Sequence, residues 1–178
     1  MPEPMTGADR TTITAQLQRP PRDVAGVAFR CPCGKPAVVA TPPRLSDGTP
    51  FPTTYYLTCP RANAACSTLE STGVMAEMAD RVHTNPQLAE RYRDAHAAYL
   101  SDRAELGARL GQSVPEIAQV SAGGMPDRVK CLHALAGHAL AAGPGVNPIG
   151  DRAVAEMGEW WAAGPCAAPS PSDPEDVR

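Results

Sequence analysis

Residues 30–60 read RCPCGKPAVVATPPRLSDGTPFPTTYYLTCP, and the expected fold class follows from this segment. It contains two runs of β-branched and aromatic residues, PAVVAT at 36–41 and TTYYLT at 53–58, and such runs are typical of β-strands. Between them, Asp47 and Gly48 form a turn signal, and four prolines stiffen the connection. The segment therefore predicts a β-hairpin with a long, rigid loop.

The pattern after the hairpin is helical. The letters STLE at 67–70 have the form of a capping box, in which Ser67 begins a helix and Glu70 reaches back to it. Asn85 and Pro86 predict another helix start, because Asn caps well and Pro suits the first helical position. Helices that follow a hairpin, rather than alternate with strands, indicate the α+β class. We expect an N-terminal β-hairpin or small antiparallel sheet packed against several α-helices.

The helix predicted over residues 86–110 carries one apolar stripe. Its members recur three, four or seven residues apart and are Leu88, Tyr92, Ala95, Tyr99, Leu106 and Leu110. Such a stripe predicts packing into the core. The length of the helix and the narrowness of the stripe leave a second hypothesis open, in which the chain is a helical adaptor that binds a protein partner through helix 86–110.

Polar segments with frequent prolines lie at both ends of the chain. We expect residues 1–22 to be a disordered N-terminal tail, residues 23–163 to form a single α+β domain, and residues 164–178 to be a disordered C-terminal tail. Cys166 falls in the last segment, and we expect it to be an unstructured thiol.

Charge and hydropathy exclude several classes of protein. The 178-residue chain has a formal net charge of -3, without the basic excess of a nucleic-acid-binding domain, so no nucleic acid partner is expected. No apolar run is long enough to span a membrane, and the first residues lack the apolar core of a signal peptide. We therefore expect a cytoplasmic protein, whose six cysteines are thiols or metal ligands rather than disulfides.

Four cysteines lie at the two ends of the predicted hairpin. Cys31 and Cys33 precede its first strand, and Cys59 and Cys66 follow its second. An antiparallel hairpin brings these ends together, and zinc prefers four such ligands in a tetrahedron. The gaps of one and six residues depart from the two-residue gap of a zinc ribbon, and buried free cysteines are the alternative. We predict a metal site of Cys31, Cys33, Cys59 and Cys131, for zinc, with an iron–sulfur cluster less favoured.

The segment RVKCLHALAGHALAA at 128–142 also carries metal-binding side chains. In a continuous helix, His133 points away from Cys131, and His138 lies about 10.5 Å farther along the axis. If the helix begins after Cys131, His133 need not point away from Cys131, and the geometric argument against His133 as a ligand weakens. Cys66, His133 and His138 therefore stay open as replacements for Cys131 in the metal site.

A thiol-dependent enzyme is the alternative to a metal-binding protein. Cys131 or Cys59 would be the nucleophile, with His133 or His138 as its base. The sequence does not decide whether the chain is an enzyme.

Three blocks of the sequence resemble a known family. They are residues 30–60, TLESTGVMAEM at 68–78 and GGMPDRVKCLHALAGHALAAGPGVNPIGDRA at 123–153. Over roughly residues 24–155, the chain resembles the bacterial family called domain of unknown function 501, and actinobacterial members are the most similar. Genes of this family often neighbour those of a septum-formation initiator and an exopolyphosphatase-type enzyme. The resemblance therefore implies a link to cell division or polyphosphate metabolism, without assigning a catalytic or metal-binding residue.

Overall fold

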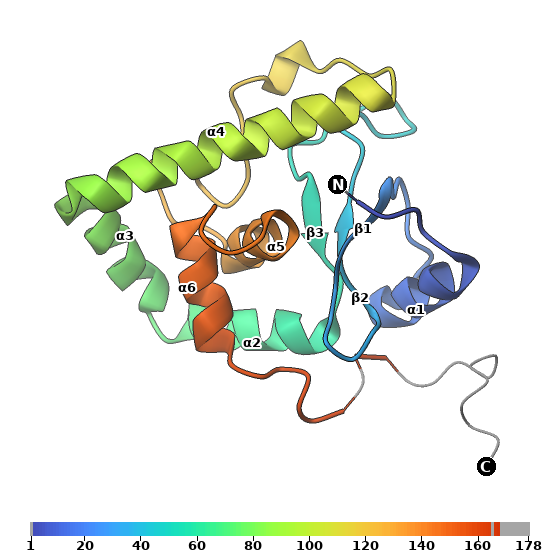
Figure 1. Ribbon diagram of the computed structural model, residues 1–178, viewed down its shortest axis with the longest axis horizontal. Coiled ribbons are helices and arrows are strands. Elements are labelled where there is room, and N and C mark those ends of the chain that lie inside the picture. Colours follow the sequence, from blue (N-terminus) through green and yellow to red (C-terminus); the bar gives the residue numbers. More distant parts are fainter. Residues whose placement is uncertain (1, 165, 168–178) are drawn as a thin grey trace.

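The structure, a computed structural model, describes residues 2–164, 166 and 167. Its strands form one antiparallel sheet in the order β1-β2-β3, with bounds β1 (Gly26–Arg30), β2 (Pro36–Ala40) and β3 (Tyr55–Leu57). This small sheet precedes most of the helices along the chain (Figure 1). The predicted α+β class, with a sheet packed against several α-helices, is confirmed.

The predicted hairpin is formed by β2 and β3, which pair antiparallel. Tyr99 holds its long loop, because its hydroxyl accepts a hydrogen bond from the Thr54 amide at 2.6 Å and donates one to the Pro52 carbonyl at 3.1 Å. Strand β1, which the sequence patterns do not indicate, pairs with the other edge of β2. Every residue of β2 is buried as a result, which explains its continuous apolar run.

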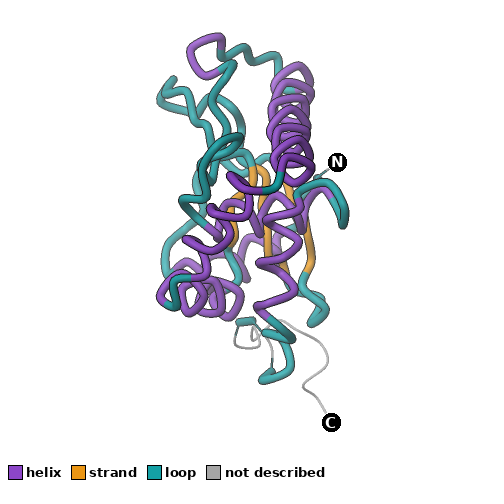
Figure 2. Tube along the Cα trace, turned by 90° about the vertical axis from the view of Figure 1, so that its left-hand side faces the viewer, coloured by secondary structure: helices purple, strands orange, loops and turns teal. Residues whose placement is uncertain are grey.

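The helices that follow the sheet pack around one central helix, α5 (Leu132–Ala142). Helix α5 contacts all three strands on one side of the sheet and packs closely against α6 (Pro148–Met157). The other helices after the sheet are α2 (Pro60–Ser71), α3 (Val74–Thr84) and α4 (Pro86–Arg109), with a short 3-10 helix at Pro115–Ile117. In Figure 1, α2 runs below α5 and α4 spans the top, and in Figure 2 helices and loops lie in front of much of the strands.

Two predicted helix starts have different outcomes. Asn85 caps α4 by accepting backbone hydrogen bonds through its side chain, as predicted. The capping box at residues 67–70 is wrong, because α2 already begins at Pro60 with Cys59 as its N-cap. Pro60 stands at the first helical position, three residues after the end of β3, and proline there favours the start of a helix. Glu70 therefore lies in the last turn of α2, where it contacts another helix.

The apolar stripe of α4 packs into the core. Tyr92, Ala95 and Tyr99 are completely buried, whereas Leu110, just past the helix, is 44% exposed. The core therefore occupies the stripe, and binding of a protein partner through helix 86–110 stays a prediction. Neither α4 nor any other described helix combines the length and apolar character that crossing a membrane requires.

The prediction of disorder over residues 1–22 is wrong for α1 (Gly7–Leu17). Asp9 completes a capping box at the start of this helix, and its carboxylate pairs with two nitrogens of Arg30 at 2.7 and 3.0 Å. Ile13 is completely buried. Contacts with the sheet therefore order a helix whose own apolar pattern is too weak to be recognised in the sequence.

The predicted C-terminal tail, residues 164–178, falls mostly outside the described residues, which include only 164, 166 and 167 of it. Cys166 is 1% exposed and belongs to the hydrophobic core, so the expectation of an unstructured thiol is wrong. Trp160 is also buried in that core and packs edge-to-face against Trp161. Burial of apolar side chains beyond the last helix explains why this end of the domain is ordered.

Candidate functional site

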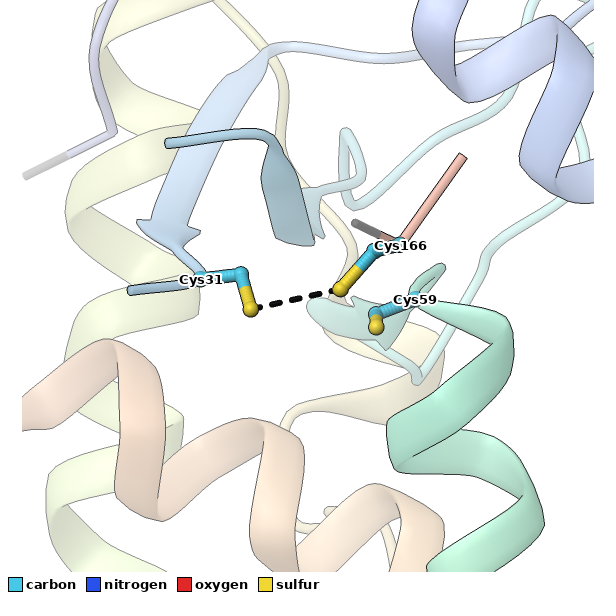
Figure 3. Close-up of side chains that lie close together, drawn as sticks. All are labelled: Cys31, Cys59 and Cys166. Carbon is cyan, nitrogen blue, oxygen red and sulfur yellow. Dashed lines mark hydrogen bonds between the residues drawn. The ribbon is translucent and has the colours of Figure 1, made fainter. Parts of the chain in front are cut away.

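Three buried thiols meet at one end of the sheet. The Sγ atoms of Cys31, Cys59 and Cys166 all lie within 4.8 Å of one another, and those of Cys31 and Cys166 are 3.3 Å apart (Figure 3). The three residues are at most 2% exposed. Because the sulfurs converge from three separate segments of the chain, they could hold one metal ion.

Local backbone structure positions these thiols. Residues 31–34 form a tight turn between β1 and β2, in which the Gly34 amide donates to the Cys31 carbonyl at 2.8 Å. Gly34 has a φ of 81°, a conformation that favours glycine. Cys59 follows β3, and its amide donates to the Ala37 carbonyl at 3.3 Å. The antiparallel sheet therefore brings the turn and the start of α2 to the same end, as the hairpin predicts.

Cys33 lies at the edge of this group, half-buried, with its Sγ 3.4 Å from that of Cys166. We call Cys31, Cys33, Cys59 and Cys166 the thiol cluster. Burial raises the pKa of the Cys31 and Cys166 thiols. Burial also acts on Cys33, but the amides of Lys35 and Cys166 outweigh it and lower the pKa of that thiol. A metal ion that binds here must displace the protons of the buried thiols.

The spacing of the sulfurs suits one tetrahedral ion. Zn–S bonds of about 2.3 Å place the ligand sulfurs of a tetrahedron about 3.8 Å apart. The two printed Sγ separations, 3.3 Å for Cys31 and Cys166 and 3.4 Å for Cys33 and Cys166, are slightly shorter than that distance, and all three buried sulfurs lie within 4.8 Å of one another. Several metals accept thiolates, so this geometry could hold a metal ion but does not identify which one.

Cys131, the other predicted ligand, lies elsewhere. Its Sγ is 4.0 Å from Nδ1 of His133, and these atoms and a carboxylate oxygen of Glu70 all lie within 4.8 Å of one another. We call Glu70, Cys131 and His133 the mixed cluster. Glu70 lies eleven residues beyond Cys59, which is about 16 Å along α2. The structure therefore brings the three cysteines predicted as ligands at the hairpin end together with Cys166 and not with Cys131.

The mixed cluster forms where the start of α5 meets the end of α2. Oε1 of Glu70 accepts a hydrogen bond from the Leu132 amide at 2.7 Å and lies 3.1 Å from Nδ1 of His133. Contact with Cys131, together with the Glu70 carboxylate, raises the pKa of His133 to about 9. The same contact with His133 lowers the pKa of the Cys131 thiol. The side chains of His133 and Glu70 are 28% and 25% exposed, so solvent reaches the cluster.

The arrangement of the mixed cluster depends on where α5 begins. Residues 128–142 are not one continuous helix, because Cys131 is extended, with φ -152° and ψ 108°, and the helix starts at Leu132. Cys131 can therefore turn toward His133, as the sequence allows for a helix that begins after Cys131.

Cys66 and His138, the other residues that could replace Cys131 as a ligand, lie in the core. Cys66 is buried, with its Sγ 3.5 Å from Sδ of Met157, and burial raises its pKa to about 12. His138 is completely buried between Tyr55 and Tyr99, with ring centroids 5.8 and 5.0 Å away. Burial lowers the pKa of His138 to about 4. Neither residue joins a metal-binding group in the described part of the chain.

An enzyme would need a cysteine nucleophile, Cys131 or Cys59, beside a histidine base. Among the described residues, the structure shows such a contact for one pair. Cys131 and His133 are neighbours. Cys59 lies among thiols, and His138 is enclosed by aromatic rings.

Sequence reasoning missed Cys166 and Glu70. A signal for Cys166 was present, since Trp160 and Trp161 extend the apolar sequence to within a few residues of it. The sequence contains no signal for Glu70, because the letters STLE predict that this residue caps the start of its own helix. Its actual partner, Leu132, is 62 residues away along the chain.

Comparisons with known proteins bear on the family. Neither the curated proteins nor the solved structures gave a significant match. A family model described as "Protein of unknown function (DUF501)" matches residues 27–155. The matched region includes both ends of the hairpin and all of α5, and it ends before Cys166. Because the match covers most of the chain, this protein belongs to the DUF501 family.

Proposed function

We propose that this protein binds one zinc ion through Cys31, Cys33, Cys59 and Cys166, and that this ion is structural. The observation that carries the proposal is the convergence of three buried thiols from segments far apart in the sequence. Four thiolates around a tetrahedral ion are a common ligand set of structural zinc sites. Zinc bound here would link the turn at residues 31–34, the start of α2 and the C-terminal end of the domain.

Cys33 supplies the fourth ligand in this proposal. Its Sγ lies 3.4 Å from that of Cys166, and backbone amides favour its thiolate form. Four protein ligands leave no coordination position for water, and such a closed site stabilises a fold rather than performing chemistry. The proposed role is therefore structural.

Zinc is favoured over an iron–sulfur cluster by the close spacing of the sulfurs. A cluster contains several metal ions and inorganic sulfide between its cysteines, whereas sulfurs within 4.8 Å of one another suit a single ion. All six cysteines are free thiols, and the cytoplasmic location that we propose would keep them reduced. The link to cell division or polyphosphate metabolism rests on the family resemblance and stays a prediction.

Metal content of the full chain tests the proposal. The protein, purified anaerobically without a histidine tag, would be examined by elemental analysis, native mass spectrometry and X-ray absorption at the zinc edge after brief exposure to a weak chelator. We expect one retained zinc with only sulfur neighbours at about 2.3 Å. A folded protein that binds no metal, or whose retained zinc has nitrogen or oxygen neighbours, would contradict the proposal.

Serine variants assign the ligands. Cys31→Ser, Cys33→Ser, Cys59→Ser and Cys166→Ser should each weaken zinc retention. Cys66→Ser is the matched control, since this thiol is as buried as that of Cys59 but lies outside the thiol cluster. Retention of zinc in Cys166→Ser, with loss in Cys131→Ser, would restore the ligand set predicted from the sequence.

A further inference from the structure

We propose that Glu70, Cys131 and His133, the mixed cluster, form a second metal site that binds a divalent transition ion such as zinc. In this site one coordination position stays open to solvent. The inference goes beyond the structural zinc of the thiol cluster and does not depend on it, because different side chains form each site.

Two helices assemble the three ligands. Cys131 is the N-cap of α5 and His133 lies in its first turn, while Glu70 comes from the last turn of α2. The Glu70 carboxylate is fixed by the Leu132 amide, which donates to Oε1 at 2.7 Å. One sulfur, one nitrogen and one oxygen ligand therefore lie within 4.8 Å of one another without any rearrangement of the backbone.

The contacts of the His133 ring place Nδ1 toward the other two ligands and Nε2 toward the backbone. Nε2 is 3.2 Å from the Asn63 carbonyl, which only accepts, so a ring with its proton on Nε2 can donate to that carbonyl and keeps the Nδ1 lone pair for a metal ion. Nδ1 faces two groups that are anionic when ionised, the Glu70 carboxylate at 3.1 Å and the Cys131 sulfur at 4.0 Å. A lone pair on Nδ1 facing these groups is repelled unless a proton or a metal ion lies between them.

The ligand set and its surroundings favour a metal ion in that position. Tetrahedral zinc places a sulfur and a nitrogen ligand about 3.6 Å apart, and a nitrogen and an oxygen ligand about 3.4 Å apart. The corresponding separations are 4.0 and 3.1 Å. A histidine that binds metal usually donates its other N–H to a carbonyl or carboxylate, and His133 lies within hydrogen-bond distance of the Asn63 carbonyl.

The position at the start of α5 also suits anionic ligands. The positive end of a helix dipole stabilises a thiolate and a carboxylate, which are the forms that bind metal. In the described part of the chain, no fourth Cys, His, Asp or Glu completes the group. With His133 28% exposed and Glu70 25% exposed, the remaining position is open to water, as it is in catalytic zinc sites.

Zinc titration of the full chain, followed by native mass spectrometry, tests the inference. We expect wild-type protein to bind two zinc ions, the second more weakly. Cys131→Ser and His133→Gln should each lose the second ion and retain the first, whereas Cys166→Ser should keep binding at the mixed cluster. His83→Gln is the matched control for His133→Gln, since His83 lies outside both clusters, and it should bind two ions.

The pattern of losses separates the two proposals. One ion that survives Cys131→Ser but not Cys166→Ser would overturn the second site and leave the structural zinc intact. One ion that is lost in Cys131→Ser but retained in Cys166→Ser would overturn the structural zinc alone. Binding of no zinc would overturn both.

Alkylation of the wild-type chain gives a test that needs no variant. Iodoacetamide labelling at Cys131, followed by peptide mass spectrometry, should slow at least tenfold at saturating zinc and recover when a chelator is added. An unchanged rate would indicate a proton between the side chains, as a thiolate–imidazolium pair, and would overturn the metal site.

Discussion

The thiol cluster and the mixed cluster differ in burial and in ligand chemistry, although each contains cysteine next to the start of a helix. The buried members of the thiol cluster are at most 2% exposed, and all of its donor atoms are sulfur. The mixed cluster offers sulfur, nitrogen and oxygen, and His133 and Glu70 are about a quarter exposed. A closed set of thiolates suits a permanent structural ion, whereas an open mixed set suits an ion that exchanges or meets solvent. Burial and ligand type, rather than cysteine spacing, therefore distinguish the two clusters.

The largest difference in stability is expected between Cys59→Ser and Cys131→Ser. A ligand that binds only the folded state stabilises it by about 4 kcal/mol at a thousand times its Kd. Cys59→Ser should lose about that amount in buffered zinc, and Cys131→Ser less than about 1 kcal/mol, since it removes the weaker, exposed site. Urea unfolding at fixed free zinc measures both.

Cys66→Ser provides the control for this comparison, because it places the same hydroxyl at an equally buried position outside both clusters. Equal losses in Cys59→Ser and Cys66→Ser would mean that the cost comes from the buried hydroxyl and not from zinc. The distinction between the clusters would then fail.

Acidification should produce the next largest effect, through His138. Its imidazole takes up a proton near pH 6.5 in the unfolded chain, but burial lowers the pKa to about 4 in the folded protein. Between these two pH values the unfolded state binds more protons than the folded state. The free energy of unfolding is therefore unaffected by His138 above pH 6.5 and decreases as the pH drops below it. The loss by pH 4 is about 3 kcal/mol, from 1.36 kcal/mol per pKa unit.

The measurement uses chelator-treated protein, because acid also releases metal from both clusters. Urea midpoints from pH 7.5 to 4.5 would be compared with those of His138→Gln, which lacks this proton uptake. A wild-type pH dependence no steeper than that of the variant would show that His138 does not contribute.

Glu70→Gln should have a smaller effect, confined to the mixed cluster. The variant keeps an oxygen for the Leu132 amide but removes the negative charge at the start of α5. Charge at a helix end contributes about 1 kcal/mol, so we expect that loss in metal-free protein. Glu77→Gln is the matched control, since its ion pair with Arg152 is 61% exposed on the glutamate side. A larger loss in Glu77→Gln would contradict this account.

Ser67→Ala should have the smallest effect. The Ser67 hydroxyl lies 3.3 Å from Nε2 of His133, but the Asn63 carbonyl accepts from the same nitrogen. We expect a change in unfolding free energy below about 0.5 kcal/mol. Ser71→Ala, which removes an exposed hydroxyl bonded within the same helix, is the control. A loss above 1 kcal/mol for Ser67→Ala alone would show that the hydroxyl, not the carbonyl, holds the ring.

Local sequence was sufficient where short-range chemistry dominates. The β-branched residues of 36–41 predicted β2, and Asn85 with Pro86 predicted the start of α4, because strand propensity and helix capping act between near neighbours. Pairing of the hairpin strands then brings Cys31 and Cys59 to one end of the sheet, so this part of the site could also be predicted.

Only the tertiary structure decided the remaining members of the clusters. Cys166 joins the hairpin thiols from 135 residues beyond Cys31, and Glu70 reaches Leu132 across 62 residues. Helix α1 is likewise held by Arg30 and by burial of Ile13, not by its own pattern. The sequence by itself determined β2, β3, the cap of α4 and the supply of thiols. The fold decided which thiols meet and which are buried, because contacts between distant segments depend on how whole elements pack.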